Sequence, residues 1–586
     1  MHVGVKQEIS FKLAGSLCLI VAFVLFFCDN VNSQALKIIN IEKYRQLRSE
    51  KLNQQRRVIY NNDGNDVIRE AEPVDTLYHM YPAQKEFSVS TFLDVRTTPL
   101  KGSDVSTIAY CTLASGFGQF THNTKVGNFY QSDSNKLFPI SPSYRIQTVI
   151  PGFVKKNTDP LEVVCEYAHK NGFEVFWSNR MNDTHDNGWD SLSKPPPLWT
   201  KFKAQHPEYL FGKIGEKMPY GAWSAVDFAR PEIRNLAVQF FTEVCENYDV
   251  DGIELDFFRH LHLFKNVAKG DTASSVEINM ITGMIARIRE MTERVGMKKG
   301  KPILVVIKVP DSFGYCRGIG IDLQKWMKEG LVDIVVGSCY FRLNPYEYLV
   351  AEGHKYNVKV YPGLSESRVK KEHPLLRRMT NPVYRARSAA ALQAGVDGTY
   401  IYNEYNPKAK YLSEIGGAEK LKTKNKLYFV TDVDPVPGRW NSPGGYLKNG
   451  EKYYNLTLLT PEIPINLHSR HLALLLEIGD ESLPARVSLA IYTSGLDAKT
   501  MKVSLNGHFL KYKKSDDKGL SVFDVPFNAV RRGHNKLKFT YNARENEAKQ
   551  KQENMPGPNL LDAALLFFRD PGDQDTKDLA AFCFDN

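Results

Sequence analysis

Cysteine is scarce in this chain and never occurs at the spacing of a metal site. Among 586 residues there are 8 cysteines, and Cys18 and Cys28 belong to an apolar N-terminal segment. The others stand far apart: Cys111, Cys165, Cys245, Cys316, Cys339 and Cys583. Because no two have ligand spacing, we expect no zinc site. A chain this long can bury a core without disulfides, so these residues are predicted to be buried thiols.

Runs of lysine and arginine are also missing, and no nucleic-acid-binding motif is present, which argues against a nucleic-acid partner. The net charge of +10 is mild for this length. It fits an anionic polysaccharide as partner, or simply a soluble protein. Aromatic residues make up 11 % of the chain, which suits either sugar-stacking surfaces or a large aromatic core.

The N-terminus resembles an export signal. Lys6 and Lys12 precede an apolar run at residues 17–27, and Val31 and Ser33 are small residues before Gln34. The run is shorter than a comfortable membrane span. We therefore expect a signal peptide at residues 1–33, a lead-in segment at 34–54, and a periplasmic or extracellular protein without a stable membrane span after cleavage. The oligomeric state is left open.

Between residues 55 and 425, eight short apolar segments alternate with amphipathic helical patterns. The expected strands are residues 57–61, 105–112, 173–178, 252–256, 303–309, 332–337, 358–362 and 398–402, and helices are expected at 160–171, 231–248, 275–295, 322–329 and 381–394. This alternation predicts an α/β fold, a (β/α)8 TIM barrel. The alternative, an open doubly wound sheet, lacks a glycine-rich phosphate loop after its early strands.

The pattern changes to short alternating segments between residues 430 and 586. Strands are expected at residues 473–477, 485–492, 502–505, 520–525, 536–541 and 563–568. Turn pairs such as Asn506-Gly507 and Arg532-Gly533 separate them. We predict a C-terminal β-sandwich accessory domain, which either binds carbohydrate or braces the barrel.

The stretch VDGIELDFFRH, residues 250–260, carries two acids on one strand face. Side chains of a strand repeat every two residues, so Glu254 and Asp256 point the same way. Acids are rare in a buried strand except where chemistry occurs or a partner neutralises them. Glu254 could alternatively be the buried partner of Arg180 or Lys308. Asp251 and Asp397 precede strands and are expected to stabilise turns.

Carboxylates and amides follow most of the strands, at the end where barrels build their active sites. Asp256 is predicted to be nucleophile or base, with Asp311, Glu366 or Glu404 as the partner acid and Glu254 as a helper. The predicted substrate-binding residues are Asn62, Asp63, Trp177, Asn179, Arg180, Asp183, Arg259, Tyr340, Asn403 and Tyr405. Such residues hold sugar hydroxyls and stack on sugar faces, so the predicted partner is carbohydrate, and no cofactor or metal is expected.

These features together resemble a known group of barrel proteins. The helix at 231–248 followed by VDGIELDFFRH, with GFEVFWSNRMND upstream and VDGTYIYNEYN downstream, is similar to the glycoside hydrolase family 10-like group of exported bacterial proteins. The resemblance covers roughly residues 55–410. It implies a (β/α)8 glycosidase, acting on a poly- or oligosaccharide that could be anionic, whose central acid ends the fourth strand at Asp256.

The same strand also resembles the D-G-x-D-x-D-x-E motif of family-18 chitinases, but with one departure. Asp251, Glu254 and Asp256 occupy the first three acidic places, and Phe258 stands where the catalytic glutamate would be. Chitinase activity is therefore not assigned, and the acid must come from another strand.

Two other functions stay open. Because Phe258 removes one acid, the barrel could bind carbohydrate without cleaving it. A metal-dependent hydrolase using Asp256, His260 and His262 is the third possibility.

Overall fold

A computed structural model describes residues 41–70, 79–112, 117–130, 148–189, 199–433, 442–467, 471–541 and 558–584. The expected signal peptide at 1–33 lies outside these residues, and a helix over 41–52 covers part of the expected lead-in. Within the described ranges, no helix combines the length and apolar character needed to cross a bilayer. Cysteines 111, 165, 245, 316, 339 and 583 are free and buried, as predicted.

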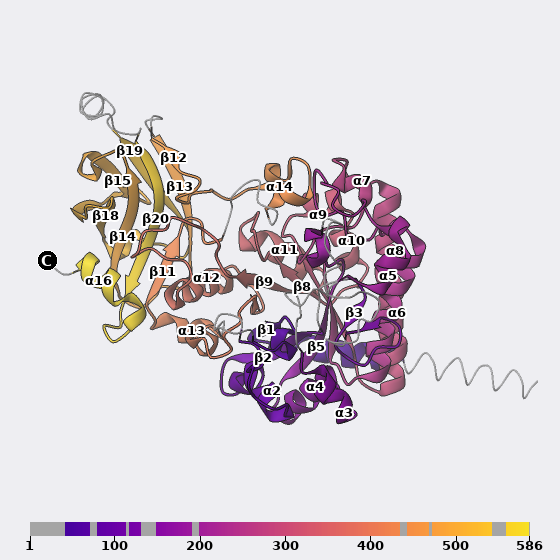
Figure 1. The fold of residues 1–586 in the computed structure, drawn as a ribbon. Coiled ribbons are helices and arrows are strands. Elements are labelled where there is room, and N and C mark those ends of the chain that lie inside the picture. Colours follow the sequence, from indigo (N-terminus) through magenta and orange to yellow (C-terminus); the bar gives the residue numbers. More distant parts are fainter. Residues whose placement is uncertain are drawn as a thin grey trace, which may run out of the picture.

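Eight parallel strands close into a barrel, which confirms the predicted fold (Figure 1). Neighbours pair in the order β1-β10-β9-β8-β7-β6-β5-β2, and β2 pairs back onto β1. The strands are β1 (Val58–Asn62), β2 (Val105–Cys111), β5 (Glu174–Arg180), β6 (Gly252–Asp256), β7 (Leu304–Val309), β8 (Ile334–Gly337), β9 (Lys359–Ser365) and β10 (Thr399–Tyr402). Each coincides with a predicted strand, because buried parallel strands have near-continuous apolar sequences.

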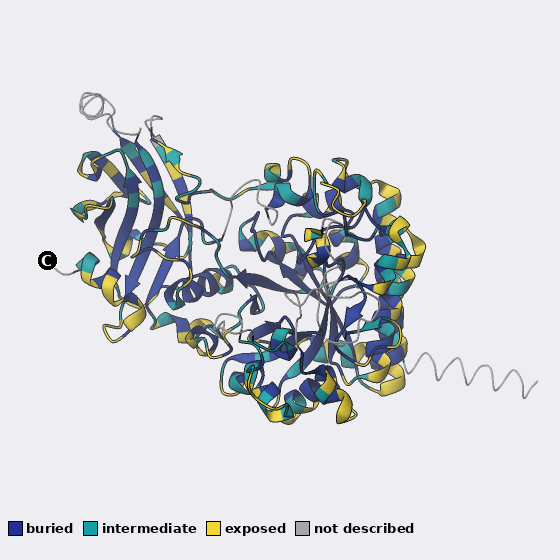
Figure 2. Cartoon of the chain, viewed as in Figure 1, coloured by how far each residue is buried: buried dark blue, intermediate teal, exposed yellow. Residues whose placement is uncertain are grey.

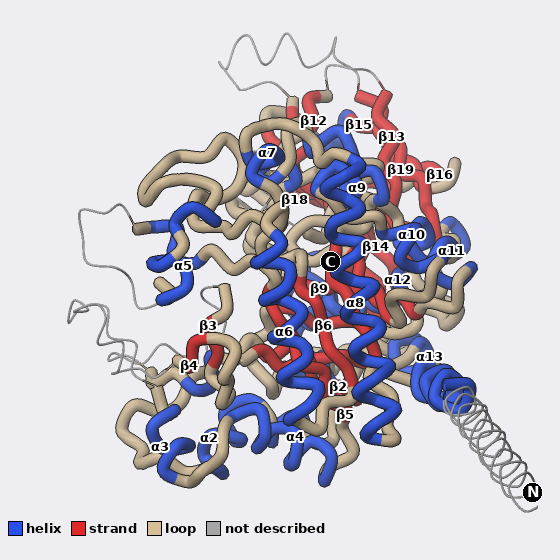
Figure 3. The backbone as a smooth tube through the Cα atoms, turned by 90° about the vertical axis from the view of Figure 1, so that its right-hand side faces the viewer, coloured by secondary structure: helices blue, strands red, loops and turns tan. Residues whose placement is uncertain are grey.

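Helices cover the outside of the barrel, with buried sides toward the strands and exposed sides toward solvent (Figure 2). The predicted ones are α4 (Pro160–Lys170), α6 (Pro231–Asn247), α8 (Ser275–Lys299), α10 (Leu323–Lys328) and α12 (Asn381–Gln393). Helix α8 begins with a capping box between Ser274 and Glu277 and ends at Gly300. Helices α6 and α8 lie side by side on one outer face (Figure 3).

The other numbered helices have ten residues or fewer. They are α2 (Val89–Arg96), α3 (Ile150–Lys155), α5 (Lys201–Gln205), α7 (Lys265–Ala268), α9 (Phe313–Ile319), α11 (Tyr346–Lys355), α13 (Ala418–Lys422), α14 (Pro443–Tyr446) and α16 (Lys577–Phe584). A two-stranded ribbon, β3 (Gln119–Phe120) with β4 (Asn128–Phe129), lies in the long connection after β2.

Asp251 and Asp397 stabilise turns, as predicted. Oδ2 of Asp251 accepts from the backbone N of Val175 at 2.9 Å, and Oδ2 of Asp397 accepts from Val360 N at 2.8 Å. Each carboxylate therefore ties the turn before its own strand to the start of the neighbouring strand. Both lie at the amino-terminal end of the barrel, opposite the face where active sites form.

The C-terminal region consists of antiparallel sheets, also as predicted. One sheet has the order β11-β20-β14-β18-β17 with β12 on β20, and the other has β13-β19-β15-β16. Their strands are β11 (Lys426–Phe429), β12 (Ile465–Asn466), β13 (His471–Ile478), β14 (Arg486–Ser494), β15 (Met501–Leu505), β16 (His508–Phe509), β17 (Lys511–Ser515), β18 (Leu520–Val525), β19 (Gly533–Tyr541) and β20 (Asn559–Phe568). Helix α12 of the barrel contacts β11 and β13.

One segment from the sandwich side returns to the barrel. Residues 442–456 leave the sandwich after β11 and lie against the loops at the carboxyl-terminal face, where α14 is drawn in Figure 1. The backbone N of Gly221 donates to Gly445 O at 2.9 Å, and Tyr315 donates to Pro443 O at 2.8 Å. This segment therefore contributes to the face on which a barrel active site is built.

Candidate active site

A cavity of about 350 Å³ opens at the carboxyl-terminal face of the barrel. Its walls come from the segments that follow β5, β6, β8 and β9 and from the returning segment at 442–456. The lining residues that matter most are His185, Arg259, His260, His262, Tyr340, Arg368 and Tyr446. The volume lies in the range of small-ligand sites, so the cavity is large enough for a sugar unit.

Arg259 is the hub of the cavity wall. It is 8 % exposed, and its Nη1 donates to the hydroxyl of Tyr340, to the Tyr402 hydroxyl at 3.1 Å and to Asn403 Oδ1 at 2.9 Å. Asn403 has a positive φ of 55°, which turns its amide back toward these groups. The structure thus brings together Arg259, Tyr340 and Asn403, three of the predicted substrate-binding residues.

Asp183 orients a histidine at the edge of the cavity. Its Oδ1 lies 2.7 Å from His185 Nδ1, and its Oδ2 accepts from Arg180 at 3.2 Å. Burial would raise the pKa of Asp183, but the neighbouring His185, His260 and Arg180 hold it well below its usual range. The carboxylate therefore fixes the His185 ring, whose Nε2 lies 3.3 Å from Arg259 Nη2.

Two further histidines follow β6 on alternate positions. His260 Nδ1 accepts from the backbone N of Thr184 at 3.1 Å. His262 is 5 % exposed, and neither of its ring nitrogens has a hydrogen-bond partner among the described residues. Burial lowers the pKa of His262 to about 3, so the ring is neutral. A loop passes directly over this ring at Gly221, where a Cβ would lie 2.2 Å from His262 Cδ2.

Asp256, the predicted central acid, is buried at the end of β6 beneath this cavity wall. Its Oδ1 accepts from the backbone N of Phe258 and of Arg259, both at 2.9 Å. Its Oδ2 forms an ion pair with Lys308 at 2.8 Å. Asp256 therefore holds the turn that places Arg259 in the wall, and it has a cationic partner in the barrel interior.

Glu254 lies deeper in the barrel and is fully buried. Its Oε1 accepts from Ser178 at 2.6 Å, from Tyr400 at 3.0 Å and from Lys308 at 3.3 Å. Glu254 is therefore the buried partner of a cation, as the alternative prediction stated, and that cation is Lys308 and not Arg180. The pKa of Lys308 is raised well above its usual value, since both carboxylates outweigh the cost of burial.

Glu366 is the predicted partner acid that lies beside the cavity. Its Oε1 accepts from Arg368 at 2.6 Å and from Asn403 at 3.3 Å. Its Oε2 has no hydrogen-bond partner among the described residues, and the side chain is 17 % exposed. One oxygen is thus held in place, and the other is buried without a hydrogen-bond partner.

Glu404 and Asp311 instead hold loops. Glu404 accepts from the backbone N of Asn406 at 2.7 Å and from the hydroxyl of Tyr411. Asp311 accepts from the backbone N of Leu343 at 3.0 Å and of Asn344 at 2.9 Å. Burial raises the pKa of Asp311 to about 6. Both oxygens of each residue are engaged, which leaves Glu366 as the better placed of the three predicted partners.

The predicted residues after β1 form a separate group around Arg96. Asp63 pairs with Arg96 and accepts from the backbone N of Asn65 at 3.0 Å, while Asn62 donates to Asp66 at 2.8 Å. The Arg96 guanidinium also lies over the Tyr405 ring, 5.3 Å from its centre. None of these six residues is among those that line the cavity.

Trp177 and Asn179 lie away from the cavity, contrary to their predicted contact with substrate. Trp177 is fully buried, with its ring 5.3 Å from Phe241 of α6 and its Nε1 donating to Thr112 at 2.9 Å. The amide of Asn179 lies against the sulfur of Met181 at 4.0 Å. Strand alternation explains this, because Ser178 between them points into the barrel.

Several site residues were missed from the sequence. Lys308 is recognisable in the sequence as the one charged residue in the apolar segment ILVVIKV. Its predicted role was only that of a partner for Glu254. His185 and Arg368 lie in loops that follow β5 and β9 and had no distinctive spacing. Tyr446 comes from the returning segment, whose position depends on the packing of the two parts of the molecule.

Within the described ranges, Asp183, His185 and His260 are the residues whose ligand atoms lie close enough to hold a metal ion, within 4.8 Å of one another. Only His260 is shared with the set predicted for a metal-dependent hydrolase, which was Asp256, His260 and His262. Asp256 instead forms an ion pair with Lys308. Arg180 bonds to Asp183, and Arg259 contacts His185. These two guanidinium groups would repel a metal ion bound between the three residues. The electrostatics therefore favour the observed hydrogen bonds over a bound metal.

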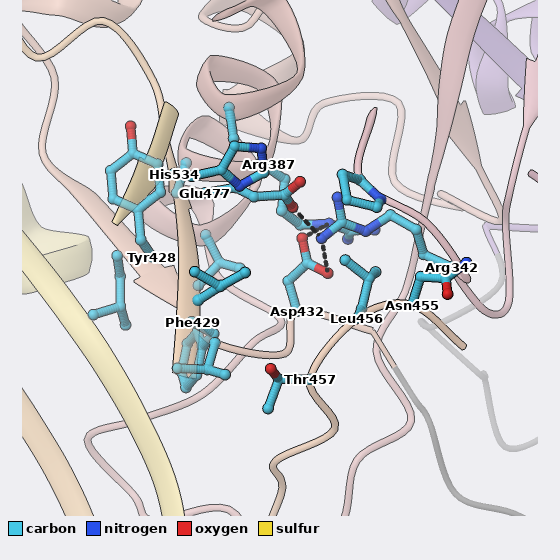
Figure 4. Close-up of a pocket in the computed structure, with 17 residues that line it drawn as sticks. Arg342, Arg387, Tyr428, Phe429, Asp432, Asn455, Leu456, Thr457, Glu477 and His534 are labelled. Atoms are coloured by element: carbon cyan, nitrogen blue, oxygen red, sulfur yellow. Dashed lines mark ion pairs between the residues drawn. The ribbon is translucent and has the colours of Figure 1, made fainter. Parts of the chain in front are cut away.

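A second cavity, of about 60 Å³, lies between the barrel and the sandwich. Arg342 pairs there with Glu477 at 2.5 Å and with Asp432 at 3.8 Å, and Arg387 lies 3.6 Å from Asp432 (Figure 4). The space is too small for a sugar unit. These pairs join the sandwich to the barrel, which suits a bracing role for the accessory domain.

Comparison with known proteins finds only remote similarities. No family model matches the sequence, and a search of curated proteins gives no match. Among solved structures, α-L-fucosidase isoenzyme 2 from Paenibacillus thiaminolyticus is 10 % identical, with 83 % of this chain and 100 % of that chain covered and a TM-score of 0.38. The PgaB (BpsB) glycoside hydrolase domain from Bordetella bronchiseptica is 10 % identical, covering 62 % and 99 %, with a TM-score of 0.37. Similarity this low supports no inference about activity, and the family 10-like grouping stays a resemblance.

Proposed function

We propose that this protein is a glycoside hydrolase that cleaves a poly- or oligosaccharide bound in the cavity at the carboxyl-terminal face. The observation that carries the proposal is Glu366. Arg368 of the cavity wall holds one of its oxygens, and the other has no hydrogen-bond partner among the described residues. A general acid needs a fixed carboxyl group with one oxygen free to donate its proton to the leaving group, and Oε2 of Glu366 is the oxygen without another partner.

Asp256 is the second carboxylate of the proposed pair. It ends the fourth barrel strand, and its Oδ1 accepts from the backbone N of Arg259, a residue of the cavity wall. Two backbone donors and Lys308 fix its orientation, as a nucleophile or base requires. The separation of the two carboxyl groups in the substrate complex decides the stereochemistry, about 5 Å for retention and about 6.5–9.5 Å for inversion.

Export belongs to the proposal as well. The N-terminal segment at 1–33 has the composition of a signal peptide. Cell fractionation of the full-length protein, with N-terminal sequencing of the secreted form, tests it. A mature protein that keeps residues 1–33 and stays in the cytoplasm contradicts export without affecting the proposed chemistry.

The contacts of Asp256 also favour a second candidate function, a carbohydrate-binding protein without catalysis. The two oxygens of Asp256 already accept three hydrogen bonds or ion pairs, and the residue is 2 % exposed. In this second candidate, the carboxylate of Asp256 shapes the binding loop and does not attack substrate.

A panel of neutral and acidic polysaccharides, with products separated by size, distinguishes the two. The hydrolase releases shorter products, and both Asp256→Asn and Glu366→Gln abolish release while circular dichroism spectra stay those of the wild type. Binding without any product favours the second candidate. Release that survives in both variants refutes the proposed carboxylate pair.

A further inference from the structure

Arg259 differs from the other buried cations of this protein. Seven other arginines are buried among the described residues, and each has a carboxylate within ion-pair distance: Arg56, Arg96, Arg289, Arg342, Arg378, Arg385 and Arg387. The buried lysines, Lys203, Lys308 and Lys426, are paired too. Among these buried cations of the described residues, Arg259 alone has no carboxylate partner: it contacts the Tyr340 and Tyr402 hydroxyls, the Asn403 amide oxygen and a ring nitrogen of His185.

A buried cation without a counter-ion is unfavourable, because desolvation is offset only by hydrogen bonds to neutral groups. The nearby carboxylates do not compensate Arg259. Asp183 bonds to Arg180 and His185, Glu366 to Arg368, and Asp256 to Lys308. The charge of Arg259 therefore has no counter-ion among these carboxylates, and a ligand that enters the cavity would have to supply one.

The cavity has the composition of an anion site. No carboxylate is among the described residues that line it, whereas Arg259, Arg368 and three histidines are. The Nε of Arg259 has no hydrogen-bond partner among the described residues, and neither ring nitrogen of the buried His262 has one. Two buried polar groups of the same wall therefore have donor capacity for a ligand.

From these observations we propose that Arg259 binds an anionic group carried by the sugar in this cavity, a carboxylate or a sulfate ester. The inference rests on the proposed function for the identity of the ligand as a carbohydrate. A guanidinium offers donors in a planar fork, which suits the two oxygens of either group. The acidic sugar would supply the counter-ion that the protein does not provide, and a neutral sugar would leave it missing.

Binding is measured by calorimetry on the full-length protein carrying Asp256→Asn, which keeps the glycan intact. The probes are an oligogalacturonate, its carboxyl-reduced form, a sulfated galactan oligosaccharide and its desulfated form. We expect at least one anionic probe to bind at least about tenfold more tightly than its neutral counterpart. Adding Arg259→Gln should weaken that binding about 30-fold or more, the effect of removing one member of a buried charge pair.

The control is Arg317→Gln, which removes the same charge from an exposed position on α9 and should leave affinity unchanged. Equal binding of the anionic and neutral forms of both probes, or equal loss in both arginine variants, overturns the inference. Which probe responds identifies the group as carboxylate or sulfate. Tight binding of an anionic probe that the wild type does not cleave refutes the hydrolase and leaves this inference standing. Cleavage of neutral glycans at undiminished rate in Arg259→Gln refutes this inference and leaves the hydrolase standing.

Discussion

The ammonium group of Lys308 lies 2.8 Å from Oδ2 of Asp256, inside the barrel and shielded from solvent. The acid that the sequence marks most clearly is therefore an ion-pair partner as well as a candidate catalyst. Lys308 also reaches Glu254 at 3.3 Å, so one lysine neutralises both acids of the fourth strand. Catalysis and folding share these residues, and their variants must be tested for both.

Lys308→Met should destabilise the protein severely. It leaves two buried carboxylates without their cation, and breaking a buried pair in this way costs about 3–5 kcal/mol. Urea denaturation followed by circular dichroism measures the change in the free energy of unfolding. Lys328→Met, on an exposed position of α10, is the control and should leave the midpoint unchanged. A wild-type midpoint for Lys308→Met would mean that the interior admits solvent.

Glu366→Gln should affect catalysis, whereas Glu404→Gln should affect stability. Glu366 has an oxygen without a hydrogen-bond partner among the described residues, and its loss should lower kcat by about 10²–10⁴-fold, the contribution of a general acid. Glu404 holds the turn at Asn406, so its variant should lower the unfolding midpoint and leave kcat nearly unchanged. Both quantities are measured on both proteins. If Glu404→Gln is the inactive variant, the acid has been assigned to the wrong strand.

Tyr446→Ala should weaken substrate binding. The ring lines the cavity and packs edge-to-face on His262, with ring centres 5.2 Å apart, and aromatic contacts contribute about 0.5–1.5 kcal/mol. We expect KM to rise by about 3–10-fold with kcat little changed, and Tyr446→Phe to behave like the wild type, since its hydroxyl has no partner among the described residues. Unchanged KM in Tyr446→Ala would show that the returning segment covers the cavity without touching substrate.

Asp311 should make stability depend on pH between about 4 and 6. Burial raises its pKa to about 6, above the value near 4 of an unfolded chain, so the native state holds this proton more tightly. The resulting stability, about 3 kcal/mol, is present below pH 4 and lost as the pH rises through 6. Urea denaturation at several pH values should show this decline in the wild type and a shallower one in Asp311→Asn. Identical slopes would contradict the raised pKa.

Local sequence patterns were sufficient for most of the fold. The eight barrel strands are apolar runs bounded by turn residues, and the cap Ser274 and the first-turn proline Pro231 mark helix starts. The turn roles of Asp251 and Asp397 followed from their place before strands. The short edge strands β16 and β17 were missed, because two to five residues in a polar context carry little periodicity.

The site was predicted less completely, because its contacts join distant parts of the chain. The sequence identified Asp183, Arg259, Tyr340, Asn403 and Glu366 as residues that follow strands, and the structure brings these near one cavity. It could not show that Trp177 faces α6, since both faces of a parallel strand are apolar. Nor could it place Tyr446, which reaches the barrel from the sandwich side.

The sequence by itself determined where strands and helices form and that Glu254 and Asp256 share one face, since these depend on spacing along the chain. Only the tertiary structure decided which charges meet. Asp256 meets Lys308 because β6 and β7 pair in a register that puts them side by side. Arg259 meets Tyr340, Tyr402 and Asn403 but no carboxylate, because the ends of β8 and β10 converge on it with neutral groups. Ionic contacts form across space, and a single sequence does not encode those distances locally.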